Sequence, residues 1–217
     1  MDNLTGPHQG QPVATAGRPL EQAKAAMILL HGRGASAADI LTLAEALPHP
    51  DFTYLAPQAA GHSWYPHSFL APLADNEPGL SSGLAVIAGL VAQLEAAGLP
   101  AEKIVIGGFS QGACLSAEFV ARNARRYGGL LAFSGGLIGP PETPRHYPGH
   151  LAGSPVFLGC SDVDFHIPAA RVQQTDQVLT QLGGQVTCRL YPNMGHTIIQ
   201  AEIDEAQQIV SSVLAGP

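Results

Sequence analysis

Hydrophobic positions in this chain fall into two patterns, continuous apolar runs and stripes at helical spacing. The continuous runs are short, as in Met27–Leu30 and Ile104–Ile106. Runs of this kind are typical of central strands that are buried on both faces of a parallel sheet. We therefore predict strands at Ala26–His31, Phe52–Ala56, Lys103–Phe109, Gly129–Ser134, Pro155–Gly159 and Val186–Tyr191.

Helical patterns fill the intervals between these strands. The clearest is an apolar stripe that starts at Leu80, recurs every three or four residues and ends at Leu94, before Gly98 and Pro100. Strands that alternate with helices predict an α/β fold with a mostly parallel central sheet and helices on both faces. Further helices are expected from Ser36 to Leu47, from about Gly112, from Pro168 to Leu182 and over Ile199–Val213.

Length and composition indicate one compact domain. The chain has 217 residues, of which 46% are hydrophobic and 12% are charged, enough to bury a sizeable core. We expect residues 1–22 to be a loosely ordered lead-in with at most a short edge strand, and residues 23–217 to form a single domain. The strand–helix connections are too brief for a full cap domain. The longest irregular stretch, Gly61–Pro78, is the best candidate for a flap over a site.

Net charge and the number of cysteines argue against a nucleic-acid-binding protein and against a disulfide-rich secreted protein. The formal net charge of −7 argues against nucleic acid as a partner. No basic cluster or run of about 18 apolar residues is present, so we expect no integral membrane association. Met1–Gly17 lacks the pattern of a signal peptide. The three cysteines, Cys114, Cys160 and Cys188, are expected to be buried, reduced thiols. We therefore expect a cytoplasmic protein.

The strongest motif is G-x-S-x-G over residues 108–112, with Ser110 at its centre. It follows an apolar strand and precedes a small-residue helix, which is the context that a nucleophile elbow requires. A Cβ atom at position 108 or 112 would crowd the neighbouring strand or helix. The motif predicts a serine nucleophile, and the alternative is a glycine-rich turn with an incidental serine. A hydroxyl alone is a poor nucleophile at neutral pH, so a base has to lie elsewhere in the chain.

His196 is the candidate for that base. It follows the last predicted strand, so it can reach the carboxyl edge of the sheet, and it fits the chain order serine, acid, histidine. Its alternative is an ordinary loop histidine. The acid comes from the loop after the Pro155–Gly159 strand. We favour Asp164, which lies deeper in that loop, and Asp162 stays the alternative, with a role in bracing the loop.

The loop after the first central strand is expected to complete an oxyanion hole. Gly32 and Gly34 allow the backbone to approach a substrate oxygen closely. We predict that the backbone N–H groups of Arg33 and Gln111 are the two donors. The alternative is a plain turn or a weak phosphate site, but the loop lacks the full phosphate-loop pattern and its lysine.

Taken together, these motifs resemble the phospholipase/carboxylesterase family of small α/β-hydrolases, which includes the acyl-protein thioesterases. Four blocks match in order, at residues 30–34, 107–113, 162–168 and 194–196. In the family the acid precedes a segment that ends in Val-Pro or Ile-Pro, and this selects Asp164. The region from His62 to Pro78 differs from the Trp-Phe-Asp-like loop of the thioesterases. It resembles a bacterial subgroup of predicted esterases.

The resemblance implies a serine carboxylesterase that hydrolyses short or medium acyl or aryl esters without a cofactor or a metal. Its partner would be a small-molecule ester substrate. Assembly into a homodimer is compatible with this interpretation. The alternatives are a lysophospholipase or an acyl thioesterase on the same triad, and a non-catalytic ligand-binding protein on the hydrolase fold. We expect the pocket wall to include the apolar residues Trp64, Tyr65, Phe69, Ile167 and Met194.

Overall fold

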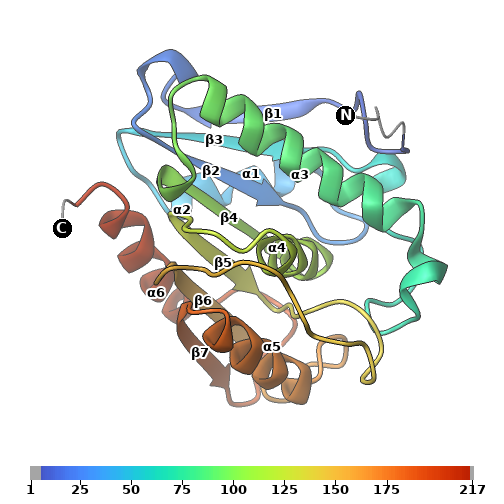
Figure 1. Cartoon of the computed structure of the whole chain (residues 1–217). Helices are drawn as coiled ribbons and strands as arrows, with labels where there is room; N and C mark the ends of the chain where they lie inside the picture. The colour runs from blue at the N-terminus through green and yellow to red at the C-terminus, as the bar shows by residue number, and fades with distance from the viewer. Residues whose placement is uncertain (1–5, 216–217) are drawn as a thin grey trace.

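A computed structural model describes residues 6–215, which form a seven-stranded sheet flanked by helices (Figure 1). The strand order is β1-β3-β2-β4-β5-β6-β7, and all neighbours pair in parallel except β1 and β3. The mostly parallel α/β prediction is therefore confirmed. The strands are β1 (Val13–Gly17), β2 (Ala25–Leu30), β3 (Phe52–Pro57), β4 (Ile104–Phe109), β5 (Gly129–Phe133), β6 (Pro155–Ser161) and β7 (Gln185–Tyr191).

Helices cover both faces of this sheet, and each face has its own hydrophobic core. One core joins the sheet to α3 (Gly79–Ala96), α4 (Gln111–Arg122) and α5 (Ala169–Gln181). The other joins it to α1 (Ala37–Leu41), α2 (Leu43–Ala46) and α6 (Gln200–Ser212), and Figure 1 shows the two layers. Every residue of β2 is fully buried between them, as its continuous apolar run predicts. Short 3-10 helices lie at Leu20–Gln22, Ala60–His62, Leu73–Asn76 and Ala101–Lys103.

The predicted helix from Ser36 to Leu47 is divided into α1 and α2. Ser36 caps α1, because its hydroxyl accepts from the Asp39 amide while the Asp39 carboxylate accepts from the Ser36 amide. Thr42 marks the division, and its hydroxyl donates to the carbonyl of Asp39 at 2.7 Å. Such side-chain bonding to a preceding carbonyl competes with the regular helical pattern.

Helix α3 has the length and hydropathy of a membrane span, with a mean hydropathy of 1.4 over 18 residues. Its apolar stripe, however, faces inward. Leu80, Ile87, Val91 and Leu94 are buried in the core that α3 shares with α4 and the sheet. The hydropathy of α3 is therefore accounted for by core packing.

The segment before β2 contains β1, which is the short edge strand predicted within residues 1–22. β1 pairs antiparallel with β3 from Val13 to Gly17. Upstream of it, His8 is buried, with Nε2 donating to the carbonyl of Trp64 at 2.8 Å and Nδ1 accepting from the amide of Ala60 at 3.1 Å. The N-terminal segment thus fixes the loop that follows β3.

The loops after β2 and β4 meet at the carboxyl edge of the sheet. The chain leaves β2 toward β3 on one side and later places β4 on the other side, so the strand order reverses between these two strands. In open α/β sheets such a reversal leaves a crevice where ligands bind. The Gly32–Gly34 loop and Ser110 both lie at this crevice.

Candidate active site

Ser110 occupies a strained turn between β4 and α4. Its backbone has φ 55° and ψ −116°, a conformation that side-chain-bearing residues rarely adopt. Its amide donates to the carbonyl of Phe133 at 2.9 Å, which ties the turn to β5. The strain is held by neighbouring structure and projects the hydroxyl above the end of the sheet.

The two outer glycines of the motif are required by lack of space. A Cβ atom at Gly108 would press on the Leu30 carbonyl and on the backbone of Gly112. A Cβ atom at Gly112 would overlap the backbone of Leu30 and His31. The crowding that the sequence predicts at positions 108 and 112 is confirmed, and it allows α4 to begin directly against β2.

Three side chains from distant parts of the chain form a single hydrogen-bonded row. His196 Nε2 lies 2.8 Å from Ser110 Oγ, and His196 Nδ1 lies 2.7 Å from Asp164 Oδ2. With Nδ1–H donating to the carboxylate, Nε2 is left to accept from the serine hydroxyl. Each residue comes from a loop at the carboxyl edge, after β4, β6 and β7.

Asp164 is held as a carboxylate by its surroundings. Burial raises the pKa of this carboxyl, but hydrogen bonds from His196 and from the amides of His166 and Ile167 outweigh burial and hold the pKa below its usual value. The other candidate acid, Asp162, accepts from the amide of Asn193 at 2.8 Å. Asp162 therefore braces the loop that carries His196, while Asp164 contacts the imidazole.

The loop after β2 is oriented by His31. The imidazole is buried, with Nδ1–H donating to the carbonyl of Gly32 at 2.8 Å and Nε2 accepting from the amide of Ala59 at 3.1 Å. Because a trans peptide points its C=O and N–H in opposite directions, this bond turns the N–H of Arg33 the other way. Gln111 is the first residue of α4, so its own N–H has no acceptor within the helix. Both residues, Arg33 and Gln111, line the cavity that contains Ser110.

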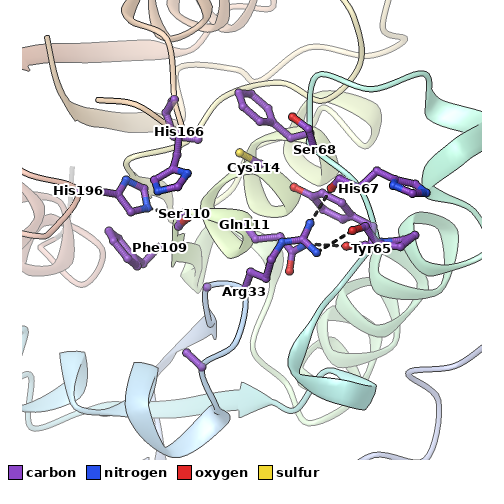
Figure 2. A pocket seen from close by; sticks show the side chains of 15 residues that line it. Arg33, Tyr65, His67, Ser68, Phe109, Ser110, Gln111, Cys114, His166 and His196 are labelled. Atoms are coloured by element: carbon purple, nitrogen blue, oxygen red, sulfur yellow. Dashed lines mark hydrogen bonds between the residues drawn. The ribbon is translucent and has the colours of Figure 1, made fainter. Parts of the chain in front are cut away.

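A cavity of about 630 Å³ opens over Ser110. In Figure 2 the rings of Phe109 and His166 flank His196, with ring centroids 4.9 and 4.8 Å from its own. In the same view Tyr65, His67 and Ser68 lie on the side away from His196, and Pro66, Phe69 and Cys114 also line the cavity. A volume of this size accommodates a small organic ligand.

Comparisons with known proteins agree with this architecture. The model of the phospholipase/carboxylesterase family matches residues 13–214. The chain belongs to the phospholipase/carboxylesterase family. It is 30% identical to acyl-protein thioesterase 1 of Eremothecium gossypii, over 94% of this chain and 93% of that protein.

Two solved structures extend the comparison. A phospholipase/carboxylesterase from Dyadobacter fermentans is 44% identical, with a TM-score of 0.88 over 94% of this chain and 96% of that one. Esterase PE8 is 27% identical, with a TM-score of 0.77 over 94% of this chain and 98% of that one. The resemblance inferred from the four sequence blocks is therefore confirmed. The protein is a carboxylic ester hydrolase with the α/β-hydrolase fold.

Three of the predicted wall residues line the cavity, namely Tyr65, Phe69 and Ile167. Trp64 and Met194 require a correction, because neither lines it. Trp64 is fully buried beneath the cavity, where its indole N–H donates to the carbonyl of His31 at 3.0 Å. Met194 is also buried away from the wall. An apolar side chain near an active site serves the core as readily as the pocket, and the sequence alone does not separate the two.

The Gly61–Pro78 loop lies along the cavity, with residues 65–69 in its wall, and is bonded to the rest of the site. The side chain of Gln111 accepts from the amide of Trp64 at 2.9 Å and donates to the carbonyl of Tyr65 at 2.8 Å. The buried Asn76 side chain bridges the His67 amide and the Ser68 carbonyl. These bonds join the predicted flap to the start of α4 and link its two halves.

Sequence reasoning missed several side chains at the site. The wall also includes His67, Ser68, Phe109, Cys114 and His166, and Figure 2 shows the Arg33 side chain among those that line it. His166 was within reach of prediction, because it lies two residues after Asp164 in the acid loop. Cys114 was not, because only the packing of α4 turns it toward the cavity.

Proposed function

We propose that this protein is a serine carboxylesterase that hydrolyses short or medium acyl or aryl esters through an acyl-enzyme intermediate. One observation carries the proposal: the hydrogen-bonded row from Ser110 through His196 to Asp164, with distances of 2.8 and 2.7 Å. A row of this kind supplies a nucleophile, a base and a group that orients and stabilises the base.

In this mechanism Ser110 attacks the ester carbonyl while His196 Nε2 takes the hydroxyl proton. The amides of Arg33 and Gln111 donate to the oxygen of the tetrahedral intermediate, where one such donor is commonly worth about 3–4 kcal/mol. His196 then gives the proton to the leaving alcohol. Water attacks the acyl-serine by the same steps in reverse, and the acid and free Ser110 are regenerated.

The same machinery would also cleave a thioester or a lysophospholipid. Acyl-protein thioesterase 1 of Eremothecium gossypii is a relative over most of both chains, and this favours thioester hydrolysis as the second candidate. The esterase reading is supported by the modest cavity and by aromatic walls at Tyr65 and Phe69. Rates with p-nitrophenyl butyrate, butyrylthiocholine and lysophosphatidylcholine would rank the three substrate classes.

A fluorophosphonate probe tests the enzyme assignment itself. We expect the probe to label the protein at Ser110, and the Ser110→Ala variant to lose both labelling and ester hydrolysis. A matched control is Ser81→Ala, which changes a half-buried serine at the start of α3 whose hydroxyl donates to Glu77 and which lies outside the cavity, and we expect it to leave both intact. Labelling that fails in the folded wild-type protein would favour a non-catalytic binding role.

A further inference from the structure

The wall of the active-site cavity has an unusual balance of charge for this chain. The protein carries a formal net charge of −7. Yet among residues 6–215 no Asp or Glu side chain lines the cavity, and Arg33 is the one permanently charged residue of its wall, accompanied by His67, His166 and His196. The charge on this wall is thus opposite in sign to that of the protein as a whole.

The Arg33 guanidinium is fixed in place by neutral acceptors. Nη1 donates to the Ser63 hydroxyl at 3.0 Å and to the Pro66 carbonyl at 2.9 Å, and Nη2 donates to the His67 carbonyl at 2.6 Å. Its charged centre lies 5.8 Å from the middle of the Tyr65 ring, and Figure 2 shows the group beside this ring. These bonds orient the side chain but leave its positive charge without a carboxylate partner.

Several other arginines of the protein have their positive charge paired with a carboxylate. Arg18, Arg122 and Arg145 each lie within 4.0 Å of an Asp or Glu oxygen, whereas Arg33, Arg126 and Arg171 have no such partner among residues 6–215. Of these three unpaired arginines, Arg33 is the one that lines the active-site cavity. Asp164, the carboxylate of the hydrogen-bonded row, has a fully buried side chain that binds His196. It therefore does not neutralise the guanidinium.

Hydrogen-bonding capacity also remains on Arg33. A guanidinium has five N–H donors, and the three bonds to the Ser63–His67 loop use three of them. Nε–H and the second Nη2–H are left, and the residue is exposed. A guanidinium held rigidly loses little conformational freedom when it binds an anion, and its planar shape suits a carboxylate.

We propose that Arg33 selects esters that carry a carboxylate group, which its guanidinium binds while its backbone amide faces the scissile carbonyl. This inference rests on the proposed esterase function and names its substrate class. Because both groups belong to one residue, the carboxylate has to lie within about one arginine side-chain length of the reacting carbonyl. Half-esters of short dicarboxylic acids meet this requirement on the acyl side, and acyloxy carboxylic acids meet it on the alcohol side.

The competing role for the Arg33 side chain is to hold the Ser63–His67 loop. That role predicts equal losses for charged and neutral substrates when the side chain is changed. Charge recognition instead predicts a change in the ratio between them. The ratio of kcat/KM for a charged ester to that for its neutral isostere is therefore the measurement, and the neutral ester also reports on correct folding.

Two pairs of isosteres distinguish the acyl and alcohol sides. Monoethyl glutarate is compared with ethyl 5-oxohexanoate, and 3-acetoxypropanoate with 4-acetoxybutan-2-one, so that a methyl ketone replaces the carboxylate in each case. The variants are Arg33→Gln and Arg33→Lys. The control is Arg126→Gln, which changes an exposed arginine that also donates to a carbonyl but lies outside the cavity.

In the wild-type protein we expect a preference for the charged member of at least one pair. Arg33→Gln should lower that ratio by about tenfold, mainly through KM, whereas Arg33→Lys should keep part of it and Arg126→Gln all of it. Higher ionic strength should reduce the preference of the wild type but not that of Arg33→Gln. The inference is overturned if the ratio is the same in wild type and Arg33→Gln for both pairs.

This outcome is distinguishable from failure of the esterase proposal. If Ser110 takes up fluorophosphonate and p-nitrophenyl butyrate is hydrolysed, the enzyme is active, and an unchanged ratio counts against Arg33 alone. If neither event occurs in the folded wild-type protein, the esterase proposal itself fails. In that case the carboxylate inference fails with it.

Discussion

At the scale of single residues, Gln111 shows how one position can serve two purposes. It lines the cavity and its backbone N–H is a proposed oxyanion donor, while its side chain binds the backbone of Trp64 and Tyr65. The motif predicts the first role, because the residue after the nucleophile starts the helix. The second role depends on where the loop after β3 lies, and no local pattern reveals that.

Gln111→Glu should therefore weaken the site without removing the backbone donor. A carboxylate still accepts from the Trp64 amide but has no N–H for the Tyr65 carbonyl, and a buried group that loses its partner costs about 1–3 kcal/mol. We expect a lower melting temperature and a lower kcat/KM for p-nitrophenyl butyrate. Gln173→Glu, at an exposed position of α5, is the control. Equal stability of both variants would contradict the bridging role of Gln111.

The three cysteine thiols are hard to ionise. Burial raises the pKa of Cys114 and Cys160 to about 12 and that of Cys188 to about 11. Cys160 also lies 3.7 Å from the Asp164 carboxylate, whose charge opposes ionisation of the thiol. The sequence predicts buried, reduced thiols from their apolar surroundings, and the structure describes all three as free, two of them fully buried.

Iodoacetamide should consequently leave the enzyme active at neutral pH. The thiolate is the reactive form, and a pKa near 11 or 12 leaves almost none of it. We expect mass spectrometry to find no rapid alkylation of the native protein, and full alkylation after denaturation with guanidinium chloride. Rapid loss of activity together with modification of Cys114, which lines the cavity, would show that this thiol is more reactive than its burial implies.

At the scale of elements, the junction of β4 and α4 depends on a backbone contact with β2. The start of α4 lies so close to Leu30 that position 112 has no room for a side chain. The strand bounds follow from the sequence because buried parallel strands are apolar throughout. The division between α1 and α2 does not, because it depends on how Thr42 bonds to one carbonyl.

Gly112→Ala should destabilise the protein by at least about 2 kcal/mol, since the added methyl group meets rigid backbone. The matched control is Gly89→Ala in α3, where a Cβ atom meets open space. Replacing a helical glycine by alanine at such a place should stabilise the protein by about 0.5–1 kcal/mol. Urea denaturation of both variants measures the difference. The packing argument fails if the two substitutions have similar effects.

At the scale of the whole molecule, the site is assembled from loops that only the strand order brings together. The sequence predicts that Ser110, Asp164 and His196 follow strands, and the observed order places those strand ends at one edge. The order itself could not be derived from the sequence, because periodicity does not say which strands are neighbours. For the same reason, the sequence did not reveal that His8 contacts the loop after β3.

The molecule also contains a buried carboxyl that the reaction does not use. Glu202 is fully buried in the first turn of α6. One of its oxygens accepts from the amide of Ile199 at 3.0 Å, and the other has no hydrogen-bond partner within the described part of the chain. Gly159 makes room for it, because a Cβ atom there would overlap the carboxyl. Burial raises the pKa of Glu202 from 4.5 to about 7.

This shift gives the stability of the whole protein a definite dependence on pH. Between pH 4.5 and about 7 the folded protein holds the Glu202 proton and the unfolded chain releases it. The free energy of unfolding therefore falls as pH rises through this window, by about 3 kcal/mol at most, and is level above it.

Glu202→Gln, which stays neutral and can still accept from the Ile199 amide, should remove the decline and be the more stable form at pH 8. Glu205→Gln, on the same helix but in a surface ion pair with Arg189, should retain it. Urea denaturation across this pH range gives the comparison, and parallel curves for wild type and Glu202→Gln would mean that another group sets the dependence.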